Sequence, residues 1–118
     1  MVTERLIQKL ELESGHVPFD EWIESLRDTK TRAAVDARLA RVRAGNFGDH
    51  KNVGGGVFEL RIYLGPGLRV YYGEQDGRIV ILLGGGDKSS QSRDIKRATQ
   101  LWQQWQQFSN NASKKLSG

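Results

Sequence analysis

Hydrophobic and polar residues alternate with a period of two along residues 57–72, a pattern that predicts paired β-strands. Phe58, Leu60, Ile62 and Leu64 alternate with Glu59, Arg61 and Tyr63. Strict alternation is typical of a strand with one buried face. A second alternating run covers residues 68–72, and the nearly all-apolar run 79–83 indicates a strand covered on both sides. The three runs together predict an antiparallel meander.

The turns between these runs predict the register. Asp76-Gly77 is typical of a two-residue hairpin, because a type I′ turn needs positive φ at both central residues. This turn places Gln75 opposite Arg78, Tyr72 opposite Ile81 and Tyr71 opposite Leu82. In the first hairpin, Leu64 opposite Leu68 matches apolar with apolar and leaves Gly65-Pro66-Gly67 as the loop. The remaining pairs are then Ile62 with Val70, Arg61 with Tyr71, and Tyr63 with Arg69.

This register predicts an apolar face and a polar face on the sheet. The polar face carries Glu59, Arg61, Tyr63, Arg69 and Tyr71. Guanidinium groups beside phenol rings suit a phosphate backbone and a stacked base. A solvated sheet face with a Glu59–Arg61 charge network explains the same pattern.

Two helices are predicted before the meander, as a helical hairpin. The first starts at Pro18 and buries the stripe Phe19, Trp22, Ile23 and Leu26. The second is capped by Asp28 or Thr29, buries Val35, Leu39 and Val42, and ends at Gly45. Its outer face is basic and includes Arg38 and Arg41.

The remaining segments complete a predicted order of β-α-α-β-β-β-α, an α+β fold with a small antiparallel sheet. Residues 6–12 alternate as a first strand, residues 46–56 are polar and glycine-rich as in a loop, and Gly84-Gly85-Gly86 indicates a turn with a close backbone approach. A last helix capped by Ser90 buries Ile95, Ala98, Trp102 and Trp105. Residues 1–108 are expected to form one domain, and the polar residues 109–118 a disordered tail.

Composition limits the classes of function. The 118 residues hold no cysteine and only two histidines, without ligand spacing, so we expect neither a metal nor another cofactor. Residues 1–14 have charges throughout and no long apolar run, so we expect no membrane anchor and a cytoplasmic location. The net charge is +4, and residues 30–43 hold five basic residues against one acid. Such a concentration of charge is weak support for a polyanionic partner.

Several motifs together resemble a known family. The resemblance covers about residues 17–105 and includes the runs FDEWIESLRD, RAGNFGDHK, GVFELRIYLGPGLRVYY and IVILLGGGDKSSQSRDIKRA. They are similar to the phage-derived Gp49-like, HigB-type "addiction module killer" branch of the RelE/ParE toxin superfamily. The resemblance implies the toxin of a type II toxin–antitoxin pair, which cuts mRNA on the ribosome. It also implies a cognate antitoxin, usually of helix-turn-helix type, and allows a toxin–antitoxin heterotetramer.

The resemblance also implies the residues of a metal-free ribonuclease site. Arg69 in LRVYY matches the superfamily's sheet arginine, which clamps the phosphate, and Lys88 in GGGDK matches the basic position after the last strand. Arg61 and Lys51 are further basic candidates, and Tyr71 is a candidate for orienting or stacking a base. The candidates for RNA contact, besides Tyr71, are Lys51, His50, Tyr63, Arg38 and Arg41.

The general base stays open at this stage. Glu59 stands where RelE-type enzymes have a basic residue, and residues 89–108 contain no tyrosine. Glu59, His50 and Lys51 compete for the role, although a carboxylate paired with arginine is a poor base. Two other functions fit the sequence: a ParE-like gyrase inhibitor without nuclease chemistry, and an inert module that only binds a partner.

Overall fold

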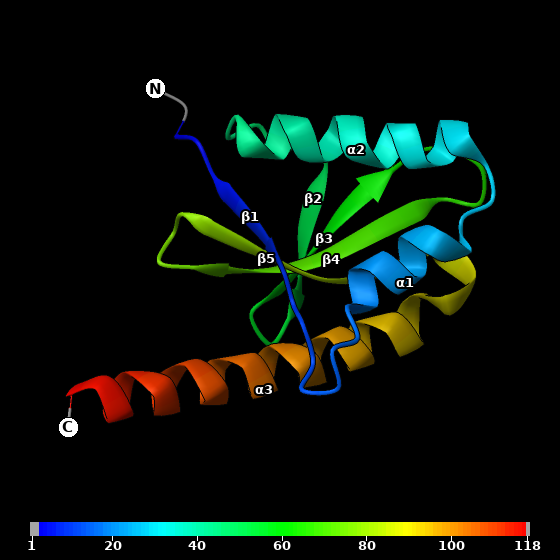
Figure 1. Ribbon diagram of the computed structural model, residues 1–118. Coiled ribbons are helices and arrows are strands. Elements are labelled where there is room, and N and C mark those ends of the chain that lie inside the picture. The colour runs from blue at the N-terminus through cyan, green and yellow to red at the C-terminus, as the bar shows by residue number, and fades with distance from the viewer. Residues whose placement is uncertain (1–2, 118) are drawn as a thin grey trace.

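A five-stranded sheet with helices on both faces forms the body of the chain (Figure 1). The computed structural model describes residues 3–117, and side chains for residues 3–111. The elements are β1 (Leu6–Lys9), α1 (Pro18–Ser25), α2 (Thr29–Arg43), β2 (His50–Gly54), β3 (Val57–Ile62), β4 (Leu68–Gln75), β5 (Ile79–Gly86), the 3-10 helix η1 (Lys88–Ser90) and α3 (Gln91–Ser117).

The sheet is mixed, with the strand order β1-β5-β4-β3-β2. The α+β class is confirmed, but the expectation of a purely antiparallel sheet is wrong, because β1 pairs in parallel with β5. No tight turn joins these two strands. A long connection through α1, α2 and three strands leaves the direction of β1 free, and a parallel pairing needs such a connection.

The segment predicted as a loop contains β2, which pairs antiparallel with β3. Its residues are polar and mostly exposed, so the sequence carries no apolar alternation there. An edge strand of this kind is held by backbone hydrogen bonds to one neighbour rather than by a buried face. The missed strand matters because it adds Lys51 to the sheet.

The register of the β3–β4 hairpin differs from the predicted one by two residues. Ile62 pairs with Leu68 and Arg61 with Arg69, while Glu59 pairs with Tyr71. The connection is therefore residues 63–67, and Leu64 is 40% exposed. A shift of two residues keeps every side chain on its face, so matching apolar with apolar could not decide between the two registers.

The β4–β5 hairpin has the predicted turn but a different ladder. Asp76 and Gly77 have φ values of 57° and 63°, and the N–H of Arg78 donates to the carbonyl of Gln75 at 3.2 Å. The pairs are offset by one residue, so Tyr72 lies opposite Leu82, and a bulge then places Tyr71 opposite Gly84. Because β5 is apolar on both sides, its pattern fits either offset.

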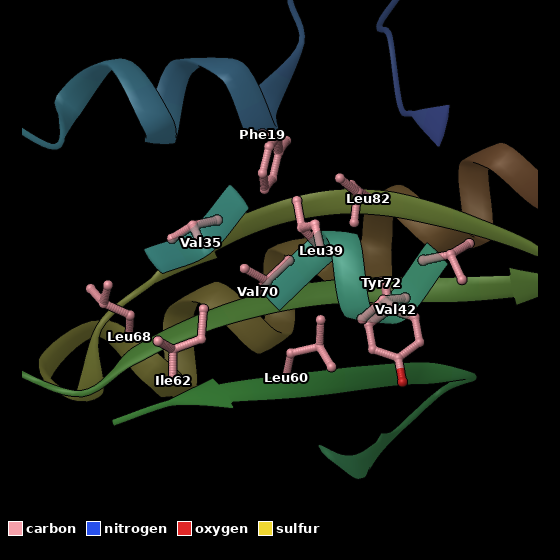
Figure 2. Packing of buried hydrophobic residues seen from close by; sticks show 11 residues of the cluster. Phe19, Val35, Leu39, Val42, Leu60, Ile62, Leu68, Val70, Tyr72 and Leu82 are labelled. Atoms are coloured by element: carbon pink, nitrogen blue, oxygen red, sulfur yellow. The ribbon is translucent and has the colours of Figure 1, made fainter. Parts of the chain in front are cut away.

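One face of the sheet packs against α1 and α2, as Figure 2 shows. Both helices start where the sequence predicts, and the Asp28 carboxylate caps α2 by accepting from the N–H of Lys30. The helices contribute Phe19, Val35, Leu39 and Val42 to a core with Leu60, Ile62, Leu68, Val70, Tyr72, Val80 and Leu82. Burial of each such apolar side chain stabilises the fold by roughly 1.5–3 kcal/mol.

The other face packs against α3, so the expectation of one solvated polar face is wrong. Ala98, Leu101 and Trp102 of α3 cover Val57, Tyr71, Ile81 and Leu83. Gly73 permits the close approach, because a Cβ there would lie 2.5 Å from the Trp102 ring. The polar residues of this face therefore lie past the N-terminal end of α3, on the part of the sheet that the body of the helix does not cover.

Helix α3 is longer than predicted. It begins at Gln91, directly after Ser90, and continues past Phe108 to Ser117, where a tail was expected. Figure 1 shows its C-terminal half projecting beyond the sheet. The side chains of residues 112–118 lie outside the described part, and the division into one domain and a disordered tail stays a prediction.

Candidate functional site

A buried carboxylate lies at the centre of the polar cluster on the α3 face. Glu59 is 0% exposed. Its Oε1 accepts from Gln91 Nε2 at 2.9 Å and from the Tyr71 hydroxyl at 3.4 Å, while Oε2 accepts from Arg61 Nε at 3.1 Å. Arg69 Nε lies 3.1 Å from Oε1 as an ion pair, without an aligned hydrogen bond. Both oxygens are therefore engaged.

The strand register brings the two arginines together. Arg61 on β3 pairs directly with Arg69 on β4, and like charges in this position repel. The carboxylate of Glu59 between them offsets the repulsion. The hydrogen bond to Glu59 raises the pKa of Arg61. Arg61 keeps 31% of its side chain exposed and Arg69 keeps 12%, so both guanidinium groups are held in place and Arg61 is the more accessible.

Lys88 lies beside this pair because the β3–β4 loop contacts η1. The N–H of Lys88 donates to the carbonyl of Pro66 at 3.4 Å. A Cβ placed on Gly67 would meet Arg69 Nη1 at 3.3 Å and the Lys88 Cβ at 3.9 Å. The Asp87 carboxylate caps η1 by accepting from Ser89, which lowers the pKa of Asp87. The Lys88 side chain itself is exposed.

Lys51 borders the cluster on the opposite side. It lies on β2 directly across from Glu59, and its side chain is exposed. Because opposite residues of paired strands share a face, Lys51 lies on the same face as the arginines. The structure thus brings together four of the predicted residues, Lys51, Arg61, Arg69 and Lys88, around Glu59. We call this set the cationic cluster.

The two tyrosines do not lie as predicted. Tyr71 is 1% exposed beneath α3, which leaves no ring face for a base to stack on, and burial raises its pKa. Tyr63 follows the end of β3 and is 80% exposed. Its hydroxyl donates to the carboxylate of Asp49 at 2.5 Å. Tyr63 therefore belongs to the loop rather than to the sheet face.

His50 lies on the other face of the sheet. It pairs with Leu60, and its ring lies 5.7 Å from that of Phe47. Nδ1 lies 2.9 Å from the carbonyl of Gly48. This places the imidazole on the side of α2, away from the cationic cluster, because neighbouring residues of a strand point to opposite faces.

The basic helix α2 contributes a structural arginine. Arg38 donates to three backbone carbonyls, those of Phe47, Asp49 and Arg61, at 2.7–3.3 Å. Partial burial lowers its pKa. Arg38 thus ties α2 to β2 and β3, and the expectation of an outward RNA-binding side chain is wrong. Arg41, in the last turn, is exposed.

Sequence analysis missed Gln91 as a member of the site. It is the first residue of α3 and donates to Glu59 across 32 positions of sequence. No local pattern marks a glutamine for such a contact, because the contact depends on where α3 lands on the sheet. The Asp94 carboxylate, which accepts from the hydroxyl of Ser90 one turn earlier, was missed for the same reason.

A cleft of about 250 Å³ opens next to the cluster, between α1, the end of β5 and the first turns of α3. Its lining includes Trp22, Tyr71, Gly85, Asp94 and Arg97. Residues 3–111 hold no group of three or more His, Asp or Glu side chains placed to bind a metal ion. None of the described helices has the length and apolar character that crossing a membrane requires.

Comparison with known proteins identifies a relative. The chain is 51% identical over 86 residues to an uncharacterized protein of Haemophilus influenzae, covering 73% of this chain and 87% of that protein. No protein-family model matches the chain. No solved structure matches it either.

Proposed function

This chain and the Haemophilus influenzae protein belong to one family, and we propose that this chain is the toxin of a type II toxin–antitoxin pair that cuts mRNA on the ribosome without a metal. The observation that carries the proposal is the cationic cluster. Two arginines stand side by side on a rigid sheet, held by one buried carboxylate, with an exposed lysine on either side. Such an arrangement suits a phosphate that gains negative charge in the transition state.

The proposed reaction is attack of an RNA 2′-oxygen on the adjacent phosphorus. The new P–O2′ bond forms as the P–O5′ bond breaks, which leaves a cyclic phosphate and a free 5′-hydroxyl. Arg61 and Arg69 would hold the phosphate and stabilise its extra charge. A base must take the 2′-proton, and an acid must give a proton to the leaving 5′-oxygen.

The geometry narrows the choice of base. Glu59 is fully buried and both of its oxygens are engaged, so we propose it as a positioning residue for the arginines. His50 lies on the other face of the sheet. Of the three candidates only Lys51 is exposed on the same face as Arg61, and we propose it for the role of base. Lys88, on the opposite border, would protonate the leaving oxygen.

The partners follow from the same proposal. An active toxin needs a cognate antitoxin, for which we propose a helix-turn-helix protein, with a toxin–antitoxin heterotetramer as a possible assembly. The proposed substrate, mRNA on the ribosome, requires a cytoplasmic location. Support for these points is the motif resemblance in residues 17–105.

The test is induction of this gene alone in a bacterial host, with mapping of mRNA 5′ ends. We compare the wild type with Lys51→Ala/Lys88→Ala and with the control Lys30→Ala/Arg78→Ala, which removes two exposed cations away from the cluster. New cut sites are expected with the wild type and the control, and at least tenfold fewer with the cluster variant. Circular dichroism establishes that all three are folded.

The other outcomes discriminate the alternatives. Growth arrest with intact mRNA would contradict the nuclease and point to a ParE-like gyrase inhibitor. Absence of growth arrest, with folded protein present, would point to a module that only binds a partner. Equal cutting by both variants would contradict the assignment of the lysines while leaving the nuclease in place.

A further inference from the structure

The cleft beside the cationic cluster is not used by the proposed cleavage chemistry. Helix α1 forms one wall and the first turns of α3 the other, with the end of β5 between them. Figure 1 shows α1 lying next to the start of α3. At about 250 Å³ the cleft is smaller than the pockets of roughly 300–1,000 Å³ that hold drug-sized ligands. It suits one planar ring system.

The floor of the cleft is a stretch of β5 whose outer edge is unpaired within residues 3–117. β1 pairs with β5 only as far as Leu82, so Gly84 and Gly85 have no strand neighbour on that side among the described residues. Trp22 of α1 lies directly on this floor, since a Cβ at Gly85 would come within 2.3 Å of its ring. The cleft therefore combines an aromatic wall with backbone at its base, which suits the face and edge of a nucleobase.

The polar groups of the cleft have both signs of charge. Glu21 and Asp94 each use one carboxylate oxygen internally, for His16 and Ser90 respectively. The second oxygen of each has no hydrogen-bond partner among the described residues. Arg97 lines the same cleft, and its guanidinium forms no ion pair within the described part of the chain. The lining thus combines hydrogen-bond acceptors, the carboxylates of Glu21 and Asp94, with the guanidinium donor of Arg97.

This combination matches one base better than the others. Guanine presents two adjacent donors, N1–H and the N2 amino group, for which the free oxygens of Glu21 and Asp94 are acceptors. It also presents O6 and N7, the pair of acceptors to which arginine binds with two hydrogen bonds. Adenine presents an acceptor at N1 and a donor at N6, so a carboxylate would face its N1 lone pair.

The cleft and the cationic cluster share a wall. Tyr71 lines the cleft, and its hydroxyl donates to Glu59, the carboxylate that holds Arg61 and Arg69. A base in the cleft would therefore sit next to the phosphate position. We propose, on the premise of the proposed function, that this cleft takes a guanine base of the RNA next to the cleaved phosphate.

Nucleotide binding tests this inference without any cleavage. Each tryptophan gives an indole N–H signal in a ¹⁵N spectrum, and Trp22→Phe assigns the Trp22 signal. Titration with 5′-GMP is expected to shift the Trp22 signal saturably, with 5′-AMP at least tenfold weaker. Arg97→Ala should abolish the shift. Lys96→Ala, an exposed neighbour that does not line the cleft, should leave it unchanged.

Cut-site mapping with the same variants separates this inference from the proposed function. Lys96→Ala is expected to cut as the wild type does, with guanine enriched at the cut site, whereas Arg97→Ala should cut less and lose that enrichment. If the wild type binds GMP selectively but does not cut mRNA, the proposed nuclease activity is contradicted and the guanine site is supported. Cutting without GMP selectivity and without guanine enrichment would overturn the guanine site alone, as would equal binding of GMP and AMP.

Discussion

At the scale of single residues, the full burial of the Glu59 carboxylate most needs a physical explanation. A carboxylate that is 0% exposed is retained only where its partners compensate for the lost hydration, and here Arg61, Arg69 and Gln91 do so. The arginines in turn depend on Glu59. Arg69 is 12% exposed and lies opposite another arginine, so it depends on the negative charge of Glu59.

Glu59→Gln tests this dependence. The substitution keeps the shape and removes the charge, which leaves two facing arginines uncompensated. We expect the free energy of unfolding to fall by about 3 kcal/mol, as for other broken buried ion pairs. Urea unfolding measures it, with Glu74→Gln as a control on β4. A loss below about 0.5 kcal/mol would mean that the cluster behaves as a surface ion pair.

The buried tyrosines predict a dependence on alkaline pH. Burial raises the pKa of Tyr71 and of Tyr72, with the nearby carboxylates of Glu59 and Glu74 adding to the effect. A raised pKa in the folded state means that the stabilisation is complete below the unfolded-state pKa of about 10. Above that pH the unfolded state loses protons first, so stability falls as the pH rises.

We therefore expect the free energy of unfolding to decrease above about pH 10, in proportion to the number of buried tyrosines. Tyr71→Phe should flatten this decrease, and Tyr71→Phe/Tyr72→Phe should flatten it further. Urea unfolding at a series of pH values measures the slope. Identical slopes in the wild type and both variants would show that other groups control alkaline unfolding.

At the scale of elements, the contact between α1 and β5 depends on a residue without a side chain. Trp22 packs on Gly85, where a Cβ would lie 2.3 Å from the ring. The glycine run thus permits the close backbone approach that the sequence predicted, although it extends β5 and is not a turn. The same contact shapes the cleft between α1 and α3.

Gly85→Ala should displace α1 and cost about 1–3 kcal/mol, as overpacking usually does. Trp22→Leu in the same chain should recover part of this loss, because the smaller side chain leaves room for the new methyl group. Thermal or urea unfolding of both single variants and the double variant measures the coupling between the two positions. Strictly additive losses would contradict a direct clash.

The elements also show what the sequence could predict. Helices α1 and α2 carry their own start signals in Pro18 and Asp28, and their apolar stripes settle which side is buried. The strands β3 and β4 were predicted from local alternation, and β5 from a local apolar run. Their register was not predicted, because a two-residue shift of β3 against β4 keeps every side chain on its face, and because β5 is apolar on both sides. β2 was missed because an exposed edge strand has no apolar pattern.

The candidate site follows the same division. Residue type and motif position suffice to predict Arg61, Arg69 and Lys88, which the structure places next to one another. The positions of Tyr71, His50 and Arg38 were predicted wrongly because each depends on a distant element: α3 buries Tyr71, and β2 and α2 determine the side to which His50 and Arg38 turn. Gln91 reaches Glu59 only because α3 packs on the sheet, so no local pattern could place it in the site.

At the scale of the whole molecule, the net charge of +4 matters through its placement. The guanidinium of Arg38 donates to backbone carbonyls, and the side chain of Arg69 is largely buried. The exposed cations of the proposed site are Lys51 and Lys88, on its two borders. If single-stranded RNA lies across this site, the two lysines contact phosphates, and binding releases the corresponding counterions.

The salt dependence of binding measures these contacts. For single strands the slope of log affinity against log salt is about −0.7 for each neutralised phosphate, so Lys51→Ala/Lys88→Ala should make the slope shallower by about 1.4. Fluorescence anisotropy with a short 2′-deoxy-substituted RNA, which cannot be cleaved, gives the affinities between about 50 and 200 mM salt. The control Lys30→Ala/Arg78→Ala should keep the wild-type slope. Equal slopes for the two variants would show that the chain attracts RNA by its overall charge, and that the cationic cluster is not where the backbone lies.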